Sequence, residues 1–230
     1  MGLKRVGVFG GTFDPPHLGH LILAEEIREA FGLAEVHFMP CNEPPHKDRE
    51  DLTDAKHRFA MVVAATVHNP AFVASPIEVN RPGKSFSIDT VRELQGTMGD
   101  DTEIVFVTGL DAFLEIETWR EYEQFLDLCQ LIVVSRPGHG FEDVAKLPDW
   151  IAARTVDLRD SEGLPADQFP AEGRCIFLSD AVHIDISSTD VRRRVAAGSS
   201  VRYQVSAEVE RYIRTHGLYR SGVVPREVAS

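Results

Sequence analysis

Two histidines three residues apart, His17 and His20, are the side chains whose spacing points most directly to chemistry. They follow a short apolar run, Val6–Phe9, and a turn that contains Gly10 and Gly11. This pattern predicts a buried strand, a glycine turn and a helix start. Helix starts present unpaired backbone N–H groups and the positive end of the helix dipole, and residues at i and i+3 share a face. The spacing therefore predicts a phosphate site.

Metal ligation by the two histidines is a weaker alternative. No third Cys, His or carboxylate stands at ligand spacing, and the chain has no H-E-x-x-H motif. We therefore expect no metal bound by protein side chains at this turn.

A second cluster, Ile186–Arg194, contains three hydroxyl residues and three consecutive arginines. Ser187 or Ser188 can cap a helix that begins here, which explains the hydroxyls without a ligand. Arg192 is harder to explain, because a cation in the first helical turn faces the unfavourable end of the dipole, and an anion held there would remove the conflict. Since successive residues turn by about 100°, we assign Arg192 to this anion, with Arg194 as the alternative.

Other segments carry weaker signals. Lys47 follows two prolines that stiffen a polar loop, although a lone lysine in such a loop is usually solvated. Gly109 ends a strongly apolar run, so its backbone can approach a ligand, and Asp111 can accept a ribose hydroxyl or hold a metal. Trp119 is either a core residue or a stacking surface for a planar ligand.

A helix N-cap is a sufficient explanation for the segment around Ser87 and Asp89.

Strand and helix patterns alternate along most of the chain. The alternation predicts an α/β fold, a Rossmann-like doubly wound parallel sheet with helices on both faces. Ligands in such folds bind at the carboxyl ends of strands, and the segments above each follow a predicted strand. The predicted strands are Val6–Phe9, Val36–Met39, Phe72–Val79, Glu103–Thr108, Leu131–Ser135 and Arg174–Leu178. The main predicted helices are Leu21–Phe31, Ala55–Val67, Ser87–Gln95, Ser188–Ala197 and Ser206–His216.

The domain organisation follows from the same pattern. Residues 1–220 are predicted to form a single domain. The acidic segment at about 138–173 contains three prolines and is predicted to be an insertion between two core strands. Residues 221–230 have no periodicity and are expected to be a disordered tail.

Composition limits the partners and the compartment. The net charge of the 230 residues is −12, which argues against nucleic-acid and anionic-membrane partners. The three cysteines are far apart and form no C-x-x-C motif, so we expect reduced thiols. The sequence has no apolar run long enough to span a membrane and no signal-peptide pattern, so we expect a cytoplasmic protein. It leaves the formation of homo-oligomers open.

The two strongest motifs together resemble those of the nucleotidylyltransferase superfamily. Its H-x-G-H and I-S-S-T-x-x-R signatures appear here as His17–His20 and Ile186–Arg192. Intermediate segments are similar to those of bacterial nicotinate-nucleotide adenylyltransferases, and the likeness covers nearly the whole chain except about 138–173 and the last ten residues. These segments are Pro44–Lys47, Ser85–Thr90, Gly109–Asp111 with Trp119, Ser135–Gly138 and Arg202-Tyr203.

The resemblance implies transfer of the adenylyl group of ATP to nicotinate mononucleotide, with release of pyrophosphate, in NAD biosynthesis. It implies Mg²⁺ bridging the phosphates, with few protein ligands. Phosphate charge would be neutralised by His17, His20, Arg192 and Lys47. The nucleotide would lie along Gly10, Gly11, Thr12, Phe13, Gly109 and Asp111, with Ile186, Ser187, Ser188 and Thr189 on the adenylate side. The pyridine nucleotide would be bound by Ser87, Asp89, Trp119 and Arg136.

Three alternatives stay open at the level of sequence. The acceptor could be nicotinamide mononucleotide or phosphopantetheine, because backbone donors that read a carboxylate are invisible in a sequence. A nucleotide sensor that binds ATP without transferring it is a further alternative. The joint presence of both histidines and Arg192 argues against the sensor.

Overall fold

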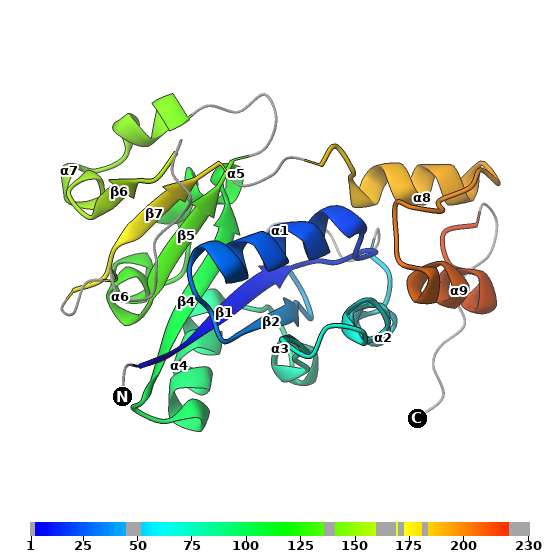
Figure 1. Ribbon diagram of the computed structural model, residues 1–230, viewed down its shortest axis with the longest axis horizontal. Helices are drawn as coiled ribbons and strands as arrows, with labels where there is room; N and C mark the ends of the chain where they lie inside the picture. Colours follow the sequence, from blue (N-terminus) through cyan, green and yellow to red (C-terminus); the bar gives the residue numbers. More distant parts are fainter. Residues whose placement is uncertain are drawn as a thin grey trace. The chain divides into compact units, whose positions relative to one another are not determined.

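The computed structural model describes residues 3–44, 52–135, 141–159, 169, 173–180 and 184–220. Seven strands form one parallel sheet in the order β3-β2-β1-β4-β5-β7-β6 (Figure 1). The strands are β1 (Lys4–Gly11), β2 (Glu35–Pro40), β3 (Phe72–Ala74), β4 (Thr102–Gly109), β5 (Gln130–Val134), β6 (Thr155–Asp157) and β7 (Ile176–Ser179). The predicted Rossmann-like α/β fold is confirmed.

Helices connect most of these strands, as parallel pairing requires. They are α1 (Leu18–Ala30), α2 (Ala55–Thr66), α3 (Ile77–Asn80), α4 (Ser87–Met98), α5 (Leu110–Phe113), α6 (Tyr122–Leu128), α7 (Asp149–Ala152), α8 (Ser188–Ala196) and α9 (Ala207–His216). Two 3₁₀ helices, η2 (Ile116–Thr118) and η3 (Phe141–Lys146), complete the described elements. Among the described residues, no helix combines the length and the apolar character that crossing a membrane requires.

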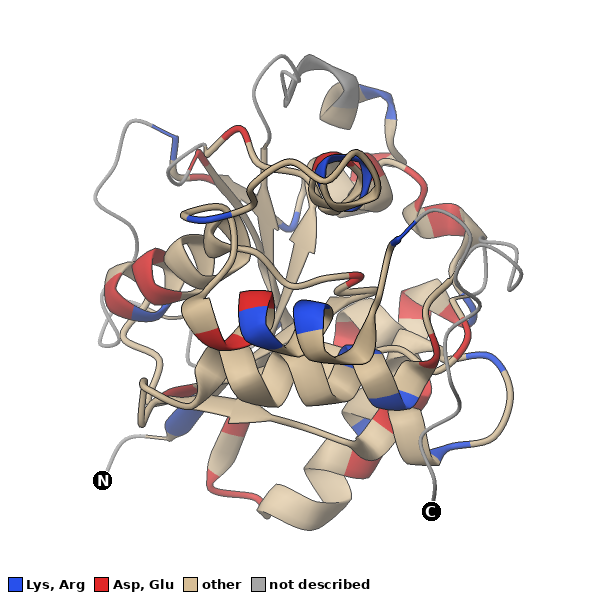
Figure 2. Ribbon diagram, turned by 90° about the vertical axis from the view of Figure 1, so that its right-hand side faces the viewer, with Lys and Arg blue, Asp and Glu red and all other residues tan. Residues whose placement is uncertain are grey.

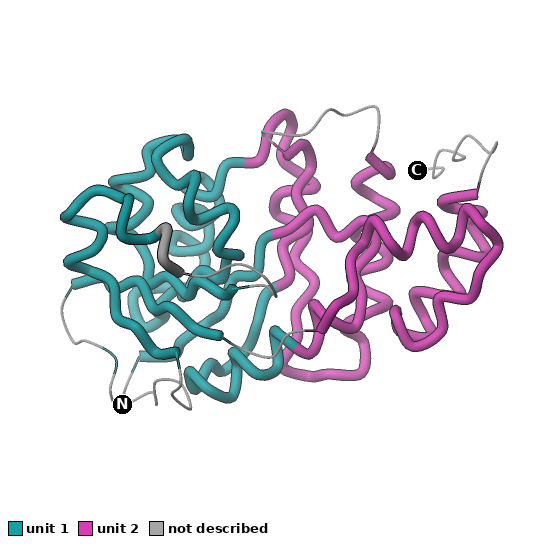
Figure 3. The backbone as a smooth tube through the Cα atoms, turned by 90° about the horizontal axis from the view of Figure 1, so that it is seen from above, with its two compact units in different colours: residues 1–10, 23–37, 86–183 teal, residues 11–22, 38–85, 184–230 magenta. Residues whose placement is uncertain are grey.

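The chain divides into two compact units (Figure 3). Unit 1 comprises residues 1–10, 23–37 and 86–183, and unit 2 comprises residues 11–22, 38–85 and 184–230. In unit 1, β4 and β5 are buried along most of their length, which explains their uninterrupted apolar sequences. In unit 2, α2 packs against α9 around a core that includes Met61, Val209 and Ile213.

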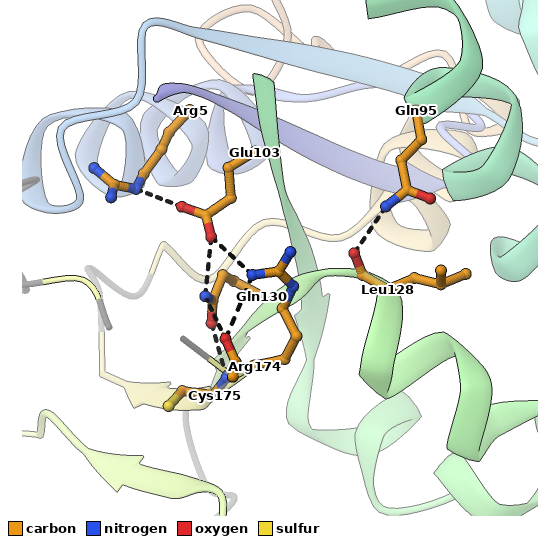
Figure 4. A network of polar contacts seen from close by, with 8 residues as sticks. Arg5, Gln95, Glu103, Leu128, Gln130, Arg174 and Cys175 are labelled. Atoms are coloured by element: carbon orange, nitrogen blue, oxygen red, sulfur yellow. Dashed lines mark hydrogen bonds and ion pairs between the residues drawn. The ribbon is translucent and has the colours of Figure 1, made fainter. Parts of the chain in front are cut away.

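A buried polar network connects β1, β4 and β5 of unit 1 near their amino ends with Arg174, which precedes β7 (Figure 4). The Glu103 carboxylate accepts from Arg5 Nε at 2.7 Å, Gln130 Nε2 at 3.0 Å and Arg174 Nη1 at 3.2 Å. Arg5 and Glu103 are also partners in the β1–β4 register. Because a buried carboxylate is stabilised only when it is paired, this network favours one register of the strands.

The prediction of a strand over Phe72–Val79 is wrong in its second half. Strand β3 covers only Phe72–Ala74, and Ile77–Asn80 forms the short helix α3. Pro76 stands between them as the helix N-cap residue. Proline has no N–H for a sheet ladder, but it is tolerated at a helix start, so the extended chain ends there.

The segment predicted as an insertion contributes to the sheet. Of its described residues, Thr155–Asp157 form β6, which pairs with β7 in parallel register. The segment also contains the short helix α7, in which Ile151 is buried. The predicted tail, residues 221–230, lies outside the described residues.

Candidate active site

The turn between β1 and α1 occupies residues 12–17 of unit 2 and has an unusual backbone. Phe13 has φ +49°, a left-handed conformation that non-glycine residues seldom adopt, and the Asp14–Pro15 peptide bond is cis. The Phe13 ring folds back over Gly11, where an added Cβ would lie 3.0 Å from that ring. Glycine at position 11 is therefore what allows this turn to form.

His17 and His20 lie face to face at the start of α1. Their ring centroids are 3.6 Å apart and the ring planes differ by 22°. The backbone N–H of His17 donates to His20 Nδ1 at 3.1 Å. Because Nδ1 acts as an acceptor, the proton of a neutral His20 ring is on Nε2, which makes Nε2 the hydrogen-bond donor.

Gly19 allows this stacking. A Cβ at position 19 would lie 3.1 Å from Nδ1 of His17 and 3.6 Å from the carbonyl oxygen of Ile184. A side chain there would push on the His17 ring, so the glycine between the two histidines is a packing requirement of the pair.

Helix α8 supplies two side chains to the same turn. Arg192 Nη1 donates to the carbonyl oxygen of Asp14 at 2.7 Å, and the Ser188 hydroxyl donates to that of Pro15 at 2.8 Å. Thr189 Oγ1 lies 3.4 Å from Arg192 Nη2. The structure thus joins the two motifs that sequence places about 170 residues apart, within unit 2.

The remaining residues of the second motif have structural partners. Ser187 is the N-cap of α8 and accepts from the N–H of Asp190 at 3.1 Å, so it, rather than Ser188, is the cap. Ile186 packs against the core of unit 2. Arg194, the alternative to Arg192, donates instead to the carbonyl oxygen of Ser200 at 2.9 Å. Arg192 is therefore the arginine that reaches the turn.

Charged residues of both signs are spread over the helices in Figure 2. On α8, Arg193 pairs with Asp190 at 2.7 Å. Since the chain as a whole is acidic, the positive charge at the turn is a local feature, to which α8 contributes Arg192.

The residues expected near a pyridine ring belong to unit 1. Trp119 is half-buried, with its ring 6.1 Å from that of Phe106 and 5.4 Å from that of Phe125. Gly109 precedes α5, and an added Cβ there would lie 2.6 Å from Oδ1 of Asp111. The Asp111 carboxylate therefore folds over the glycine backbone.

The N-cap explanation for Ser87 and Asp89 is wrong. The N-cap residue of α4 is Phe86, which makes no side-chain cap hydrogen bond, and Ser87 is already inside the helix. Asp89 pairs with Arg120 at 3.2 Å, and the Arg120 guanidinium lies 5.0 Å from the centre of the Phe86 ring. Helix α4 thus begins without a side-chain hydrogen bond from its N-cap residue.

Two predicted residues, Lys47 and Arg136, lie outside the described residues. Gly10 lies at the end of β1 in unit 1, where an added Cβ would be 3.3 Å from the Phe106 ring. Thr12 follows β1, and its carbonyl oxygen accepts from Arg58 Nη1 at 2.9 Å.

Sequence reasoning missed Arg58, which is only 1% exposed. Besides Thr12, its guanidinium donates to the carbonyl oxygens of Thr53 at 2.9 Å and Asn42 at 2.8 Å. It therefore connects the turn of residues 12–17 to Asn42 and Thr53. The available signal was a charged residue within the helical pattern of 55–67, a position that is usually solvated.

Sequence reasoning also missed Asp14 and Tyr219. The Tyr219 hydroxyl donates to Asp14 Oδ1 at 2.6 Å, and the Thr53 N–H donates to Asp14 Oδ2 at 3.2 Å. Asp14 is inside the glycine-turn motif, so its position was a signal, whereas nothing in the local sequence marks Tyr219.

The described residues contain no group of three or more His, Cys, Asp or Glu side chains that could hold a metal ion. The imidazole N–H and guanidinium groups at the turn are hydrogen-bond donors that suit phosphate oxygens, whereas Mg²⁺ prefers oxygen ligands such as carboxylates. This donor set does not fit a resident magnesium site.

Comparisons with known proteins agree with these motifs. A family model described as cytidylyltransferase-like matches residues 8–194. A probable nicotinate-nucleotide adenylyltransferase of Thermoanaerobacter sp. (strain X514) is 39% identical over 218 residues, which cover 94% of each chain. A protein of the same name from Moorella thermoacetica is 41% identical over 217 residues, covering 94% of this chain and 92% of that protein.

A solved structure shares the fold. Plasmodium falciparum nicotinic acid mononucleotide adenylyltransferase, complexed with NaAD, aligns with a TM-score of 0.66 at 18% identity. The alignment covers 94% of this chain and 97% of that one.

Proposed function

This chain belongs to the nicotinate-nucleotide adenylyltransferase family, and we propose that it transfers the adenylyl group of ATP to nicotinate mononucleotide. The products are nicotinate adenine dinucleotide and pyrophosphate. The observation that carries the proposal is that both motifs contact the same turn. The backbone N–H of His17 donates to His20 Nδ1, and Arg192 donates to the carbonyl oxygen of Asp14. Two structures of the Plasmodium falciparum protein are complexes with NaAD and with APC, which supports nucleotide substrates for this chain.

The reaction needs little acid–base chemistry. A phosphate oxygen of nicotinate mononucleotide forms a bond to the α-phosphorus of ATP, and the bond between that phosphorus and its bridging oxygen to the β-phosphate breaks. The electron pair leaves with pyrophosphate. Because the attacking phosphate is already an anion at pH 7, catalysis consists of positioning and charge stabilisation.

His20 and Arg192 are assigned to the departing pyrophosphate. Nε2–H of His20 donates a hydrogen bond, and the Arg192 guanidinium supplies a positive charge. His17 orients His20 through its backbone N–H and its stacked ring.

Mg²⁺ enters this proposal as part of the ATP substrate. The described residues offer it no group of three ligating side chains, so the ATP phosphates would hold the ion. Magnesium would then neutralise phosphate charge, and the protein residues would orient the phosphates.

The cytoplasmic location expected from the sequence also remains part of the proposal.

Trp119, Ser87 and Asp89 are assigned to the pyridine nucleotide. The half-buried indole offers a surface on which a pyridine ring can stack. The N–H groups in the first turn of α4 suit the nicotinate carboxylate, since anions are stabilised at helix starts. A carboxamide lacks that negative charge, so this assignment favours nicotinate over nicotinamide.

The test is pyrophosphate release with ATP and Mg²⁺ in the presence of nicotinate mononucleotide, nicotinamide mononucleotide or phosphopantetheine. We expect a strong preference for the nicotinate compound. A preference for another acceptor would overturn the assignment of the pyridine residues while leaving the transfer chemistry in place. No release with any acceptor would overturn the proposed enzyme and favour a nucleotide sensor.

A further inference from the structure

The C-terminal part of unit 2 contacts the phosphate turn through a tyrosine. Tyr219, three residues after the end of α9, donates its hydroxyl to Asp14 Oδ1 at 2.6 Å. Asp14 is 1% exposed, and its other oxygen, Oδ2, accepts from the N–H of Thr53. Both oxygens of a buried carboxylate are therefore fixed from two different segments of the chain.

The same residue holds Arg192 through its main chain. The Asp14 carbonyl oxygen accepts from Arg192 Nη1 at 2.7 Å. A residue whose side chain is held at both oxygens has little freedom to rotate, so its carbonyl is a fixed acceptor. The orientation of the guanidinium thus depends on how firmly Asp14 is held.

Both ends of the Tyr219–Asp14 bond are next to strained backbone. Phe13, which precedes Asp14, has φ +49°, and Tyr219 itself has φ +62°. Such left-handed conformations of bulky residues persist only where surrounding contacts determine them. The hydrogen bond is one of the contacts that hold the turn in this form.

We propose that Tyr219 is a positioning residue for adenylyl transfer: its hydroxyl fixes Asp14, and Asp14 in turn orients Arg192 toward the departing pyrophosphate. The inference rests on the proposed function, because it assigns Arg192 to that leaving group. Tyr219 itself touches no reacting atom in this scheme. Its effect on catalysis passes through the Asp14 carbonyl.

The hydroxyl stays protonated under ordinary conditions. Burial, and after it the neighbouring Asp14 carboxylate, raise the pKa of Tyr219 well above 10. Tyr219 therefore remains a donor throughout the pH range in which an enzyme of this kind is assayed.

A purely structural role is the competing explanation. The Tyr219 ring packs against the core of unit 2, and its hydroxyl oxygen lies 3.8 Å from the sulfur of Met61. Tyr219→Phe separates the two roles, because it keeps the ring and removes only the hydroxyl.

Tyr212→Phe is the matched control. Tyr212 lies on α9, packs against the same core and forms a hydrogen bond between its hydroxyl and a buried partner, His57 Nδ1, at 2.9 Å. This partner is on α2 rather than on the phosphate turn. The control therefore removes the same atom from the same core without touching Asp14.

The experiment measures kcat and KM for both variants at a temperature at which thermal unfolding shows them folded. For Tyr219→Phe we expect kcat about tenfold lower and KM for ATP within twofold, because Arg192 acts on charge that develops in the transition state. For Tyr212→Phe we expect kcat within twofold of the wild type. Equal kcat values for the two variants and the wild type would overturn the inference.

A double-mutant cycle tests the route through Arg192. If Tyr219 acts only by orienting Arg192, adding Tyr219→Phe to Arg192→Ala should lower kcat by less than twofold further. A further tenfold loss would overturn this route. Independently of activity, ¹⁵N relaxation of the Arg192 side chain should show increased motion in Tyr219→Phe, and unchanged motion would count against the proposal.

The two proposals fail in different ways. If the proposed function is wrong, the wild-type chain releases no pyrophosphate, whatever stands at position 219. If only the present inference is wrong, the wild type turns over and Tyr219→Phe turns over equally well.

Discussion

Substitutions at His20 can separate the two hydrogen bonds that its ring makes possible. Nδ1 accepts from the backbone N–H of His17 at 3.1 Å, which leaves Nε2 to donate to phosphate. The amide oxygen of asparagine can occupy the place of Nδ1, whereas the longer glutamine side chain reaches the place of Nε2. His20→Asn therefore keeps the structural bond and removes the proposed catalytic donor.

The expected magnitudes follow from this geometry. Loss of one preorganised donor to a transition-state oxyanion typically lowers kcat by a factor of 100 or more, about 3 kcal/mol. We expect this loss in both His20→Asn and His20→Ala. His20→Ala also leaves the His17 N–H without its acceptor, so its free energy of unfolding should be lower than that of His20→Asn by roughly 1 kcal/mol.

The assay combines pyrophosphate release with chemical unfolding of the same samples. His20→Gln should recover part of kcat while losing the bond to the His17 N–H. The reasoning would be refuted if folded His20→Asn kept more than a third of the wild-type kcat, because Nε2 would then not be the catalytic donor.

The remaining predictions concern three buried or half-buried side chains. Trp119→Ala should raise the KM for the pyridine nucleotide and leave the KM for ATP within twofold; if steady-state kinetics show neither KM changed, the indole is only a core residue. Arg58→Lys should lower the free energy of unfolding by about 3 kcal/mol in urea titrations, because a lysine cannot reach all three carbonyl oxygens that Arg58 binds. A decrease of less than about 1 kcal/mol would contradict this prediction. Burial raises the pKa of Cys129 to about 12, so above pH 9 the unfolded chain loses the thiol proton while the folded chain keeps it. Stability should therefore fall as pH rises, by about 1.4 kcal/mol at pH 10 relative to pH 8, and Cys129→Ala should lack this component of the slope.

The sheet was predictable because its central strands are marked by local sequence. Strands β4 and β5 are buried on both faces, so their apolar residues form continuous runs that few other structures produce. The boundary at Pro76 was harder, because the alternation of residues 72–79 outweighed one proline in the pattern. Edge strand β6 is three residues long and mostly exposed, so it leaves no periodic signal.

Helix α2 buries charged and polar side chains together with apolar ones. Met61 and Val62 are fully buried, whereas Val63 and the C-cap residue Val67 are 44% and 61% exposed. The same buried face contains His57 and Arg58, which bind Tyr212 and the carbonyl oxygen of Thr12. A buried arginine is stable only when its donors find acceptors, and those acceptors are carbonyl groups, which no sequence pattern displays.

The same limit explains which residues of the candidate site the sequence could suggest. Imidazole and guanidinium groups can bind phosphate, and they stand here in short continuous motifs, so the sequence could suggest His17, His20 and Arg192. Their partners are main-chain groups, the His17 N–H for His20 and the Asp14 carbonyl oxygen for Arg192. Asp14 is in turn held by the hydroxyl of Tyr219, which is 205 positions away. Such contacts exist only after the chain has folded. If Tyr219 does set the position of Arg192, the precision of this site is determined by residues that carry no sign of catalysis. Substitutions outside the motifs should then change kcat without changing the identity of any catalytic group.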